Sequence, residues 1–516
     1  MHGPDSEPAA DAQAFALSLI SHTNVGKTTL ARTLLKRDVG EVRDEAHVTL
    51  EAERFRLIES LAHDRLELWD TPGLGDSVRL ARRLVQQGNP IGWFLSEVWD
   101  RFRDRPFWSS QRAIRNILER ADVVLYLVNA SEAPQDVGYL DAELQVLDLL
   151  GKPVIVLLNQ MGPPRPPGEE AVEIERWRRR TEAAGCVRAV LALDAFARCW
   201  VQEDTLLQAV REALPAARRA AFERLRAAWL ARDRAVWLAA MQLLARRLSR
   251  AALDRETIKA DGWKGRLREI GAALGLRREG SLTAREDAMQ VLAERLDEDI
   301  RATTDSLIGL HGLHGKAAGI VLARIAAHYA VREPVSEGKA AVWGGVITGA
   351  LTGLKADLMT GGLTLGGGLL AGGVLGALGA AGIARGYNLV RGVDAPRLMW
   401  SQPVLNELVR SALLTYLAVA HFGRGRGNWA ASEYPLFWDE KVDAVTARQR
   451  ERLEAIWKRR ETAADRSAGA TTASAAESEL ILALEQWLSA ATEFLLADLY
   501  PMRSPEQPTR VARTMS

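Results

Sequence analysis

The chain has few of the features that mark secreted, disulfide-stabilised or nucleic-acid-coating proteins. Its 516 residues include two cysteines, Cys186 and Cys199, which give no disulfide framework and no metal-ligand spacing. The charges nearly cancel, at +1, so no overall field favours nucleic acid and we expect no specific nucleic-acid partner. The first eleven residues are polar and acidic, without the basic and apolar regions of a signal peptide, which predicts a cytoplasmic protein.

The most informative stretch runs from Ser21 to Thr29, between a strand-like apolar run and a helix-like run. That order is the context of a phosphate-binding P-loop, whose backbone N–H groups and helix N-terminus surround the phosphates. The pattern G-x-x-x-x-G-K-[ST] departs at its first position, where Ser21 replaces glycine. We predict that Lys27 reaches the β- and γ-phosphates and that Thr28 binds Mg²⁺. The other predicted nucleotide contacts are Ser21, Asn24, Val25, Gly26 and Thr29.

A second motif, Asp70-Thr71-Pro72-Gly73, ends a short apolar strand that begins at Leu66. In P-loop NTPases an aspartate at this point holds the magnesium shell, and the glycine N–H can sense a γ-phosphate. We therefore predict Asp70 as a second metal ligand and assign Gly73 to the catalytic group with Lys27. A glycine-containing turn in an unrelated α/β domain is the alternative.

Residues 14–215 are predicted to form one α/β P-loop NTPase domain, a G domain with a mostly parallel sheet. Apolar runs alternate with helical or loop segments, and their near-continuous apolar character suits strands buried on both faces. The predicted strands are Phe15–Ile20, Phe55–Ile58, Leu66–Trp69, Val123–Val128 and Val154–Leu158. The aromatic-rich helical segment between Gly75 and Ala121 is either a structural insertion or a partner-binding switch.

These motifs resemble those of the translation-factor-related GTPases, especially the Era/TrmE-like branch. Asn24-Val25-Gly26-Lys27-Thr28 is similar to the G1 motif of that branch, and Asp70-Thr71-Pro72-Gly73 to its G3 motif. The resemblance implies that GTP and GDP bind with Mg²⁺, and it adds Thr49 as a switch I metal ligand. The chain also resembles a bacterial group of GTPases that carry an uncharacterised C-terminal domain.

The base-reading motif departs from the family pattern. Where the family has Asn-Lys-x-Asp, this chain has Asn159-Gln160-Met161-Gly162, so the aspartate that pairs with the guanine edge is absent. We expect Asn159 and Gln160 to contact the base. Asp194 either supplies a replacement carboxylate or is a surface aspartate, so the preference for GTP follows from the resemblance alone.

The water-orienting glutamine of Ras-like enzymes is also absent, because Leu74 follows Asp-Thr-Pro-Gly. Some members of the resembled branch use a potassium ion held partly by the P-loop asparagine, and Asn24 occupies that position. The resemblance therefore implies slow hydrolysis stimulated by K⁺, with Asn24 in the catalytic group. A loop-capping role for Asn24 is the alternative.

Beyond Pro215 the pattern changes to long helices. Residues 216–255 carry ten arginines against three acidic residues, which fits either a packed helix with a solvated arginine face or a helix on anionic lipid. Further helices are predicted at 285–332, 402–421, 440–466 and 475–499, the last two separated by a linker around Gly469–Ser478. The predicted divisions are 1–13 disordered tail, 14–215 G domain, 216–335 helical domain, 336–390 glycine-rich hairpin, 391–500 helical C-terminal region and 501–516 disordered tail.

A glycine-rich apolar hairpin is predicted between residues 340 and 383. Met359 to Ile383 holds 25 uncharged residues, enough for about 37 Å of helix against a hydrocarbon core of about 30 Å. Glycines at intervals of four allow close helix–helix approach but disfavour a helix in water. The hairpin is either a membrane-associated element or an element buried inside the protein.

We therefore expect a GTP-binding switch protein that hydrolyses GTP slowly and couples its nucleotide state to a helical effector domain at the inner face of the membrane. The expected ligands and partners are guanine nucleotide, Mg²⁺, K⁺, membrane lipid and an unidentified protein effector. Two other classes stay open. One is an ATPase with altered base specificity, and the other is a non-hydrolysing membrane scaffold that only binds nucleotide.

Overall fold

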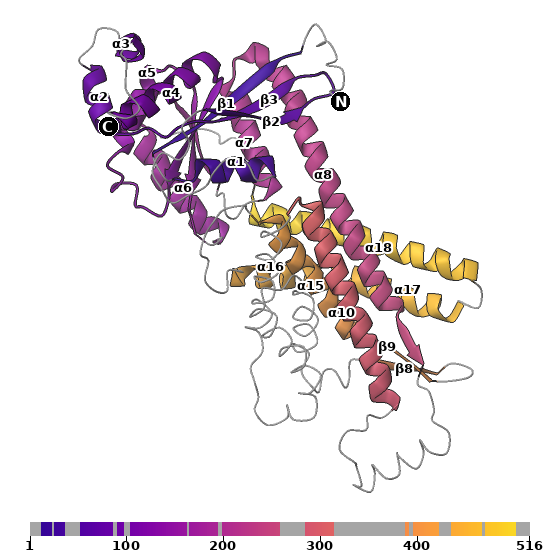
Figure 1. Cartoon of the computed structure of the whole chain (residues 1–516). Coiled ribbons are helices and arrows are strands. Elements are labelled where there is room, and N and C mark those ends of the chain that lie inside the picture. Colours follow the sequence, from indigo (N-terminus) through magenta and orange to yellow (C-terminus); the bar gives the residue numbers. More distant parts are fainter. Residues whose placement is uncertain are drawn as a thin grey trace, which may run out of the picture. The chain divides into compact units, whose positions relative to one another are not determined.

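The fold is taken from a computed structural model of the chain (Figure 1). The structure describes residues 12–22, 25–36, 52–85, 90–96, 104–162, 165–193, 199–257, 284–313, 387–391, 396–422, 435–466 and 470–501. The chain divides into two compact units. Unit 1 comprises 1–233, 423–426 and 493–516, and unit 2 comprises 234–422 and 427–492.

A six-stranded sheet with the order β2-β3-β1-β4-β5-β6 forms the centre of unit 1. β3, β1, β4, β5 and β6 are parallel, and β2 pairs antiparallel with β3 at one edge. The strands are β1 (Ala14–Ser21), β2 (Glu53–Glu59), β3 (Arg65–Asp70), β4 (Val123–Asn129), β5 (Val154–Asn159) and β6 (Val187–Ala192). The predicted P-loop fold with a mostly parallel sheet is confirmed, as are its five strands.

Each face of this sheet has its own apolar core, because successive strand residues point to opposite faces. Val124, Tyr126 and Val128 of β4 belong to one core, and the intervening Leu125 and Leu127 belong to the other. Helices on the first face are α2 (Ser77–Val85), α3 (Pro90–Ser96), α4 (Arg105–Arg120), α5 (Leu140–Leu149) and α6 (Pro167–Thr181). Helices on the second face are α1 (Lys27–Leu35), α7 (Trp200–Ala213) and the first half of α8 (Ala216–Leu253).

Strand β6 escaped the sequence analysis. It lies at the edge of the sheet, and its residues are mostly half-buried. Arg188 interrupts the apolar run, so the segment lacks the continuous apolar character on which the other strands were recognised.

The arginines in the first half of α8 bind acidic residues of unit 1. Arg224 donates to both carboxylate oxygens of the buried Asp64, at 2.7 and 2.9 Å. Arg226 makes the same bidentate contact with Asp204, also at 2.7 and 2.9 Å. For these residues the structure favours a packed helix over a helix lying on lipid.

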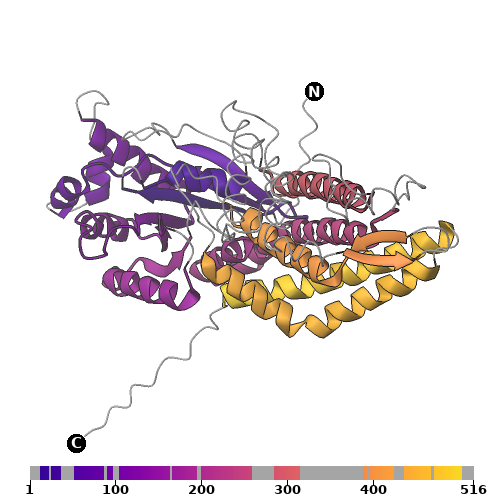
Figure 2. The same cartoon turned by 90° about the horizontal axis from the view of Figure 1, so that it is seen from below.

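Unit 2 is mainly helical. It contains the second half of α8, α10 (Ala284–Leu310), α15 (Gln402–Ala420), α16 (Leu436–Arg448), α17 (Arg450–Arg466) and most of α18 (Ala470–Leu499). Unit 2 also contains a small antiparallel sheet in the order β7-β9-β8. Its strands are β7 (Arg255–Thr257), β8 (Tyr387–Arg391) and β9 (Pro396–Trp400). Figure 2 shows β8 and β9 in orange as a hairpin. These short strands were not predicted.

Three helix predictions need correction. The helix predicted at 285–332 ends early, because α10 stops at Leu310 and a turn with Gly312 at a φ of 66° follows. The segment 440–466 contains two helices, because α16 ends at Arg448 and α17 starts at Arg450. The linker predicted around Gly469–Ser478 is wrong from residue 470 onward, where α18 is already helical. That stretch is rich in alanine, the residue with the highest helix propensity, so its simple composition is compatible with a helix.

One described helix is long and apolar enough to cross a membrane, the Ala475–Leu499 part of α18, with a mean hydropathy of 1.4. Of its most apolar window, 44% is buried inside the protein, and a single helix of this kind is weak evidence for a membrane span. Asn24, Thr49, Asp194 and the hairpin predicted at 340–383 lie outside the described residues.

Candidate nucleotide-binding site

The carboxyl ends of the parallel strands bring the predicted site residues to one edge of the sheet. Leu19 of β1 is paired with Asp70 of β3, and Ser21 ends β1 two residues later. Asn159 ends β5 and is paired with Asn129 at the end of β4. In open α/β sheets ligands bind at this edge, and Ser21, Asp70 and Asn159 are therefore placed where a nucleotide site is expected.

The turn into α1 has a backbone conformation that requires glycine. Gly26 has a φ of 92°, and a Cβ atom there would lie 2.8 Å from the side-chain amide nitrogen of Asn159. That amide donates a hydrogen bond to the carbonyl of Val25 at 2.7 Å. Asn159, at the end of β5, thus supports the backbone of the loop. Lys27 begins α1 directly after this loop.

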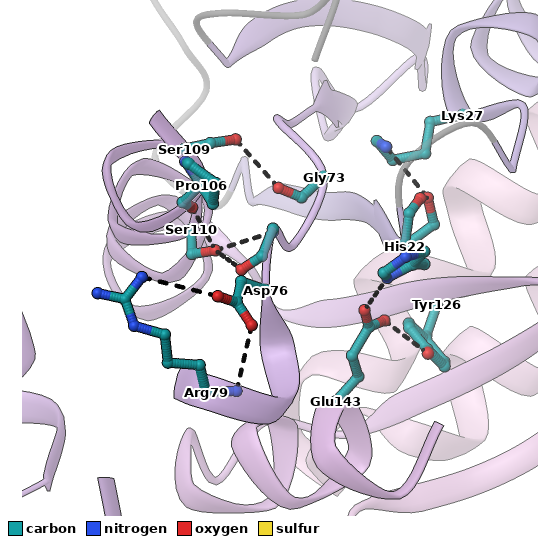
Figure 3. Close-up of polar contacts among 12 residues, drawn as sticks. His22, Lys27, Gly73, Asp76, Arg79, Pro106, Ser109, Ser110, Tyr126 and Glu143 are labelled. Atoms are coloured by element: carbon teal, nitrogen blue, oxygen red, sulfur yellow. Dashed lines mark hydrogen bonds and ion pairs between the residues drawn. The ribbon is translucent and has the colours of Figure 1, made fainter. Parts of the chain in front are cut away.

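Lys27 points back to the start of its own loop. Its Nζ donates to Oγ of Ser21 at 3.0 Å, and the Ser21 hydroxyl in turn donates to the carbonyl of His22 (Figure 3). The lysine is only 8% exposed. Burial lowers the pKa of Lys27, while the nearby carboxylates of Asp70 and Glu143 act in the opposite direction. The residue at the opening-glycine position thus supplies a partner for the phosphate-binding lysine.

Thr28 and Asp70 meet across the site. The hydroxyl of Thr28 donates to Oδ2 of Asp70 at 2.6 Å. Burial raises the pKa of Asp70 to about 6, although Lys27 and the Thr28 hydrogen bond oppose this shift. The other carboxylate oxygen, Oδ1, is buried and has no hydrogen-bond partner.

This arrangement fits a magnesium ion. Mg²⁺ prefers oxygen ligands and commonly binds through one or two carboxylates together with substrate phosphates. An unpartnered buried carboxylate oxygen beside a hydroxyl provides such a donor set, and a cation would stabilise the charged form of Asp70. Thr28 and Asp70 would hold the ion, which neutralises phosphate charge when bound.

Val25 and Thr29 contribute buried side chains. Val25 belongs to the core beside α1, and the Thr29 carbonyl accepts a hydrogen bond from Thr33 within the helix, at 2.8 Å. Gln160, next to Asn159, has a φ of 59°, a left-handed conformation that is uncommon outside glycine. The nucleotide contacts assigned to these residues stay predictions.

The turn that contains Gly73 is held from two sides. The N–H of Leu74 donates to the carbonyl of Ser21 at 3.0 Å, which attaches the turn to the P-loop strand. On the other side Ser109 of α4 donates to the carbonyl of Gly73 at 3.0 Å (Figure 3). The predicted γ-phosphate sensor thus has a defined backbone position.

A buried carboxylate behind the P-loop was missed by the sequence analysis. Glu143 of α5 accepts a hydrogen bond from the Tyr126 hydroxyl at 2.7 Å and lies 2.7 Å from Nδ1 of His22, between the two side chains (Figure 3). The His22 ring stacks on Tyr139 with centroids 4.0 Å apart. An acidic residue on the same helix face as Leu140 and the other apolar residues of α5 was the available signal.

Comparison with protein families separates the chain into two parts. The family model for the 50S ribosome-binding GTPase matches residues 17–160. This region is a GTPase domain of that family. A second model, a domain of unknown function named DUF3482, matches residues 331–486. The GTPase domain therefore contains the P-loop, the Asp70 turn and Asn159, and the chain carries a distinct C-terminal domain. A search of curated proteins finds no match.

Solved structures give distant matches to this chain. Era in complex with MgGDPNP and nucleotides 1506–1542 of 16S ribosomal RNA is 18% identical, with a TM-score of 0.29, over 40% of this chain and 58% of that chain. A point variant of Era from Aquifex aeolicus, bound to GDP and AlF4⁻, is 15% identical, with a TM-score of 0.27, over 56% and 89%. The bacterial selenocysteine-specific elongation factor EF-Sec is 17% identical, with a TM-score of 0.25, over 39% and 28%. This chain thus spans less than two thirds of the first of these proteins.

Proposed function

We propose that the protein is a Mg²⁺-dependent GTP-binding switch that hydrolyses GTP slowly. The observation that carries the proposal is the convergence of Lys27, Thr28 and Asp70 at the strand ends, with a buried carboxylate oxygen left for a metal ion. The match of residues 17–160 to a GTPase family supports guanine nucleotide as the ligand.

The preference for guanine is tested by competition. A fluorescent GDP derivative bound to the full chain is displaced with GTP or with ATP in the presence of Mg²⁺. We expect GTP to displace it at a concentration at least tenfold lower. Equal displacement would favour the ATPase alternative, which stays open because the guanine-pairing aspartate is absent after Asn159-Gln160.

Hydrolysis is proposed to depend on a potassium ion held in part by Asn24. Leu74 stands where Ras-like enzymes have a water-orienting glutamine, so this chain needs another source of transition-state stabilisation. Turnover of GTP is measured with KCl and with NaCl, for the wild type and for Asn24→Ala. We expect faster turnover in KCl, and only in the wild type. Equal rates in all four conditions would reject the potassium role, and the absence of turnover would favour the binding-only scaffold.

We further propose that the protein is cytoplasmic and contacts the inner face of the membrane through residues 336–390. The support is the run of 25 uncharged residues from Met359 to Ile383. Flotation of the full chain with liposomes, in the GDP state and with a non-hydrolysable GTP analogue, tests the proposal. Flotation in at least one state is expected. A chain that is soluble without detergent and never floats would make the segment an internal packing element.

A further inference from the structure

Two consecutive serines of α4 are hydrogen-bonded to the backbone of the turn that follows Asp70. Ser109 Oγ donates to the carbonyl of Gly73 at 3.0 Å, and Ser110 Oγ accepts from the N–H of Gly75 at 3.0 Å (Figure 3). Both serines are buried, at 2% and 0% exposure. Each hydroxyl thus binds the backbone of a turn about 35 residues earlier in the chain.

The residue between these two glycines is hydrogen-bonded to the P-loop strand and not to α4. Leu74 is fully buried, its N–H donates to the Ser21 carbonyl at 3.0 Å, and it forms a parallel bridge with His22. Three successive residues of the turn are therefore held alternately by α4, by the P-loop strand and by α4 again. The turn can move away from α4 only if the two serine contacts break.

The serine pair connects to the rest of the helical insert through α4. Directly after the serines, Gln111 donates to the carbonyl of Phe94 in α3 at 2.8 Å. Arg79 of α2 pairs with Asp104, next to the start of α4, at 3.2 Å, and its guanidinium lies 4.4 Å from the ring centre of Phe107. The helices α2, α3 and α4 are thus linked to one another by polar and aromatic contacts.

We propose that Ser109 and Ser110 are positioning residues that fix the Gly73 N–H for the γ-phosphate and transmit movement of this turn to the α2–α4 insert. The proposal rests on the GTP-switch function proposed above. It identifies the α2–α4 insert as the part of the protein that responds to the bound nucleotide. It assigns the aromatic-rich insert to the partner-binding switch, the second of the two interpretations that its sequence allows.

The hydrogen bond between Ser110 and Gly75 can be made and broken reversibly. Its hydroxyl accepts from Gly75 and also lies 2.9 Å from the carbonyl of Pro106, one turn earlier in α4. When the turn moves away, the Ser110 hydroxyl can still donate to the Pro106 carbonyl of its own helix, so this buried hydroxyl keeps a hydrogen-bond partner. Because a typical net hydrogen bond changes an equilibrium by about 2- to 10-fold, the contact can be made and broken by nucleotide binding.

The first arm of the test needs no nucleotide. Amide hydrogen exchange is measured on the nucleotide-free full chain for the wild type, for the double variant Ser109→Ala/Ser110→Ala, and for the control Ser96→Ala. Ser96 is an exposed serine of the same insert whose hydroxyl donates to Trp93 within its own helix. Exchange in the peptide that contains Gly73 to Gly75 should become about 2- to 10-fold faster in the double variant only. Unchanged exchange would overturn the positioning role.

The second arm separates positioning from simple structural support. We expect the double variant to bind a non-hydrolysable GTP analogue about 2- to 10-fold more weakly than the wild type, with unchanged affinity for GDP. The state-dependent difference in exchange at α3 and α4 should disappear. The single variant Ser110→Thr keeps the hydroxyl. It should match the wild type in its affinity for the analogue and in the state-dependent exchange at α3 and α4. An equal loss of affinity for GDP and the analogue, or a persistent difference at α4, would overturn the proposal. If the wild type binds neither nucleotide, the proposed function fails, and the first arm still decides whether the serines hold the turn.

Discussion

The ammonium of Lys27 is hydrogen-bonded to the hydroxyl of Ser21, at 3.0 Å, across the start of the P-loop. Most P-loop patterns have glycine at the position of Ser21 and therefore have no side chain there. In this protein the phosphate-binding lysine already has a side-chain partner, and a bound phosphate has to compete with it or share the lysine with it.

Replacing Ser21 by glycine should tighten nucleotide binding. Without the serine hydroxyl the buried ammonium loses a hydrogen-bond partner in the nucleotide-free protein. The free energy of nucleotide binding then becomes more favourable, because the phosphates no longer replace that partner. Because a hydrogen bond to a charged group contributes about 1.5–3 kcal/mol, of which only a part is recovered on binding, we expect GTP and GDP affinities to rise about 3- to 10-fold. Isothermal titration calorimetry on the full chain measures the change.

Ser18→Ala is the matched control for Ser21→Gly. Ser18 lies on the same strand, and its buried hydroxyl donates to Asn116 of α4 at 2.8 Å, away from the lysine. This variant should lose thermal stability without a change in affinity. If Ser21→Gly binds nucleotide no better than Ser18→Ala does, the competition between serine and phosphate is not significant.

Asp70→Asn should remove the magnesium dependence of nucleotide binding. The amide keeps the shape of the carboxylate and can accept from Thr28, but it is a much poorer ligand for Mg²⁺. Affinity for GDP is measured in Mg²⁺ and in EDTA. We expect the two values to agree for Asp70→Asn and to differ for the wild type and for Asp76→Asn, an exposed aspartate of the same loop. A variant that keeps its full magnesium effect would place the metal elsewhere.

Arg224→Met should destabilise the protein through Asp64. Asp64 is fully buried, and although burial alone raises its pKa, the hydrogen bonds from Arg224, Gln13 and Ser60 hold that pKa below its usual value. Removing the arginine leaves a buried carboxylate with fewer donors, which costs about 1–3 kcal/mol in the free energy of unfolding. Denaturant titration measures it. Arg246→Met, on an exposed position of the same helix, is the control.

The double variant Arg224→Met/Asp64→Asn distinguishes a packing role from a lipid-binding role for this arginine. Since the asparagine is neutral, the double variant should recover part of the lost stability. A helix whose arginines serve to bind lipid would behave differently. Arg224→Met would then reduce flotation with anionic liposomes and leave the free energy of unfolding unchanged.

His421 should make the protein sensitive to mild acid. Burial lowers the pKa of His421 to about 4, against about 6.5 in an unfolded chain. Between these values the unfolded state binds a proton that the folded state does not, so stability is complete above pH 6.5 and falls as the pH drops toward 4. The full effect is about 3 kcal/mol, at 1.36 kcal/mol for each pH unit of the shift.

Acid unfolding followed by circular dichroism measures this dependence. His421→Gln should flatten the loss of stability between pH 6.5 and 4, although it also removes a hydrogen bond to the Leu417 carbonyl and the contact with Trp438. If His421→Gln loses stability between pH 6.5 and 4 as steeply as the wild type does, His421 is not the acid-sensitive group.

The sequence was sufficient for the P-loop and the parallel sheet because their signals are local. A strand, a glycine-containing loop and a helix follow one another from Ala14 to Leu35, and the Asp70 turn ends a strand with an apolar pattern. Composition was a weaker guide, and the alanine-rich start of α18 was taken for a linker.

The contacts around the loop could not be predicted because they join residues that are far apart in the chain. His22 and Glu143 are separated by 121 positions, and nothing near either residue indicates the other. Ser109 and Ser110 are ordinary residues of a helix until the turn they hold is placed beside them. Only the packing of α4 and α5 against the sheet brings these groups together.

The most direct test of the account is a binding titration of the full chain with a fluorescent GTP derivative and Mg²⁺, for the wild type, Lys27→Ala and Lys36→Ala. Lys36 lies at the opposite end of α1 and pairs with Asp233 at 2.8 Å, so its replacement controls for the loss of a lysine from this helix. We predict saturable, Mg²⁺-dependent binding by the wild type and Lys36→Ala, and no detectable binding by Lys27→Ala. Tight, Mg²⁺-dependent binding by Lys27→Ala would contradict the assignment of this loop as the nucleotide site.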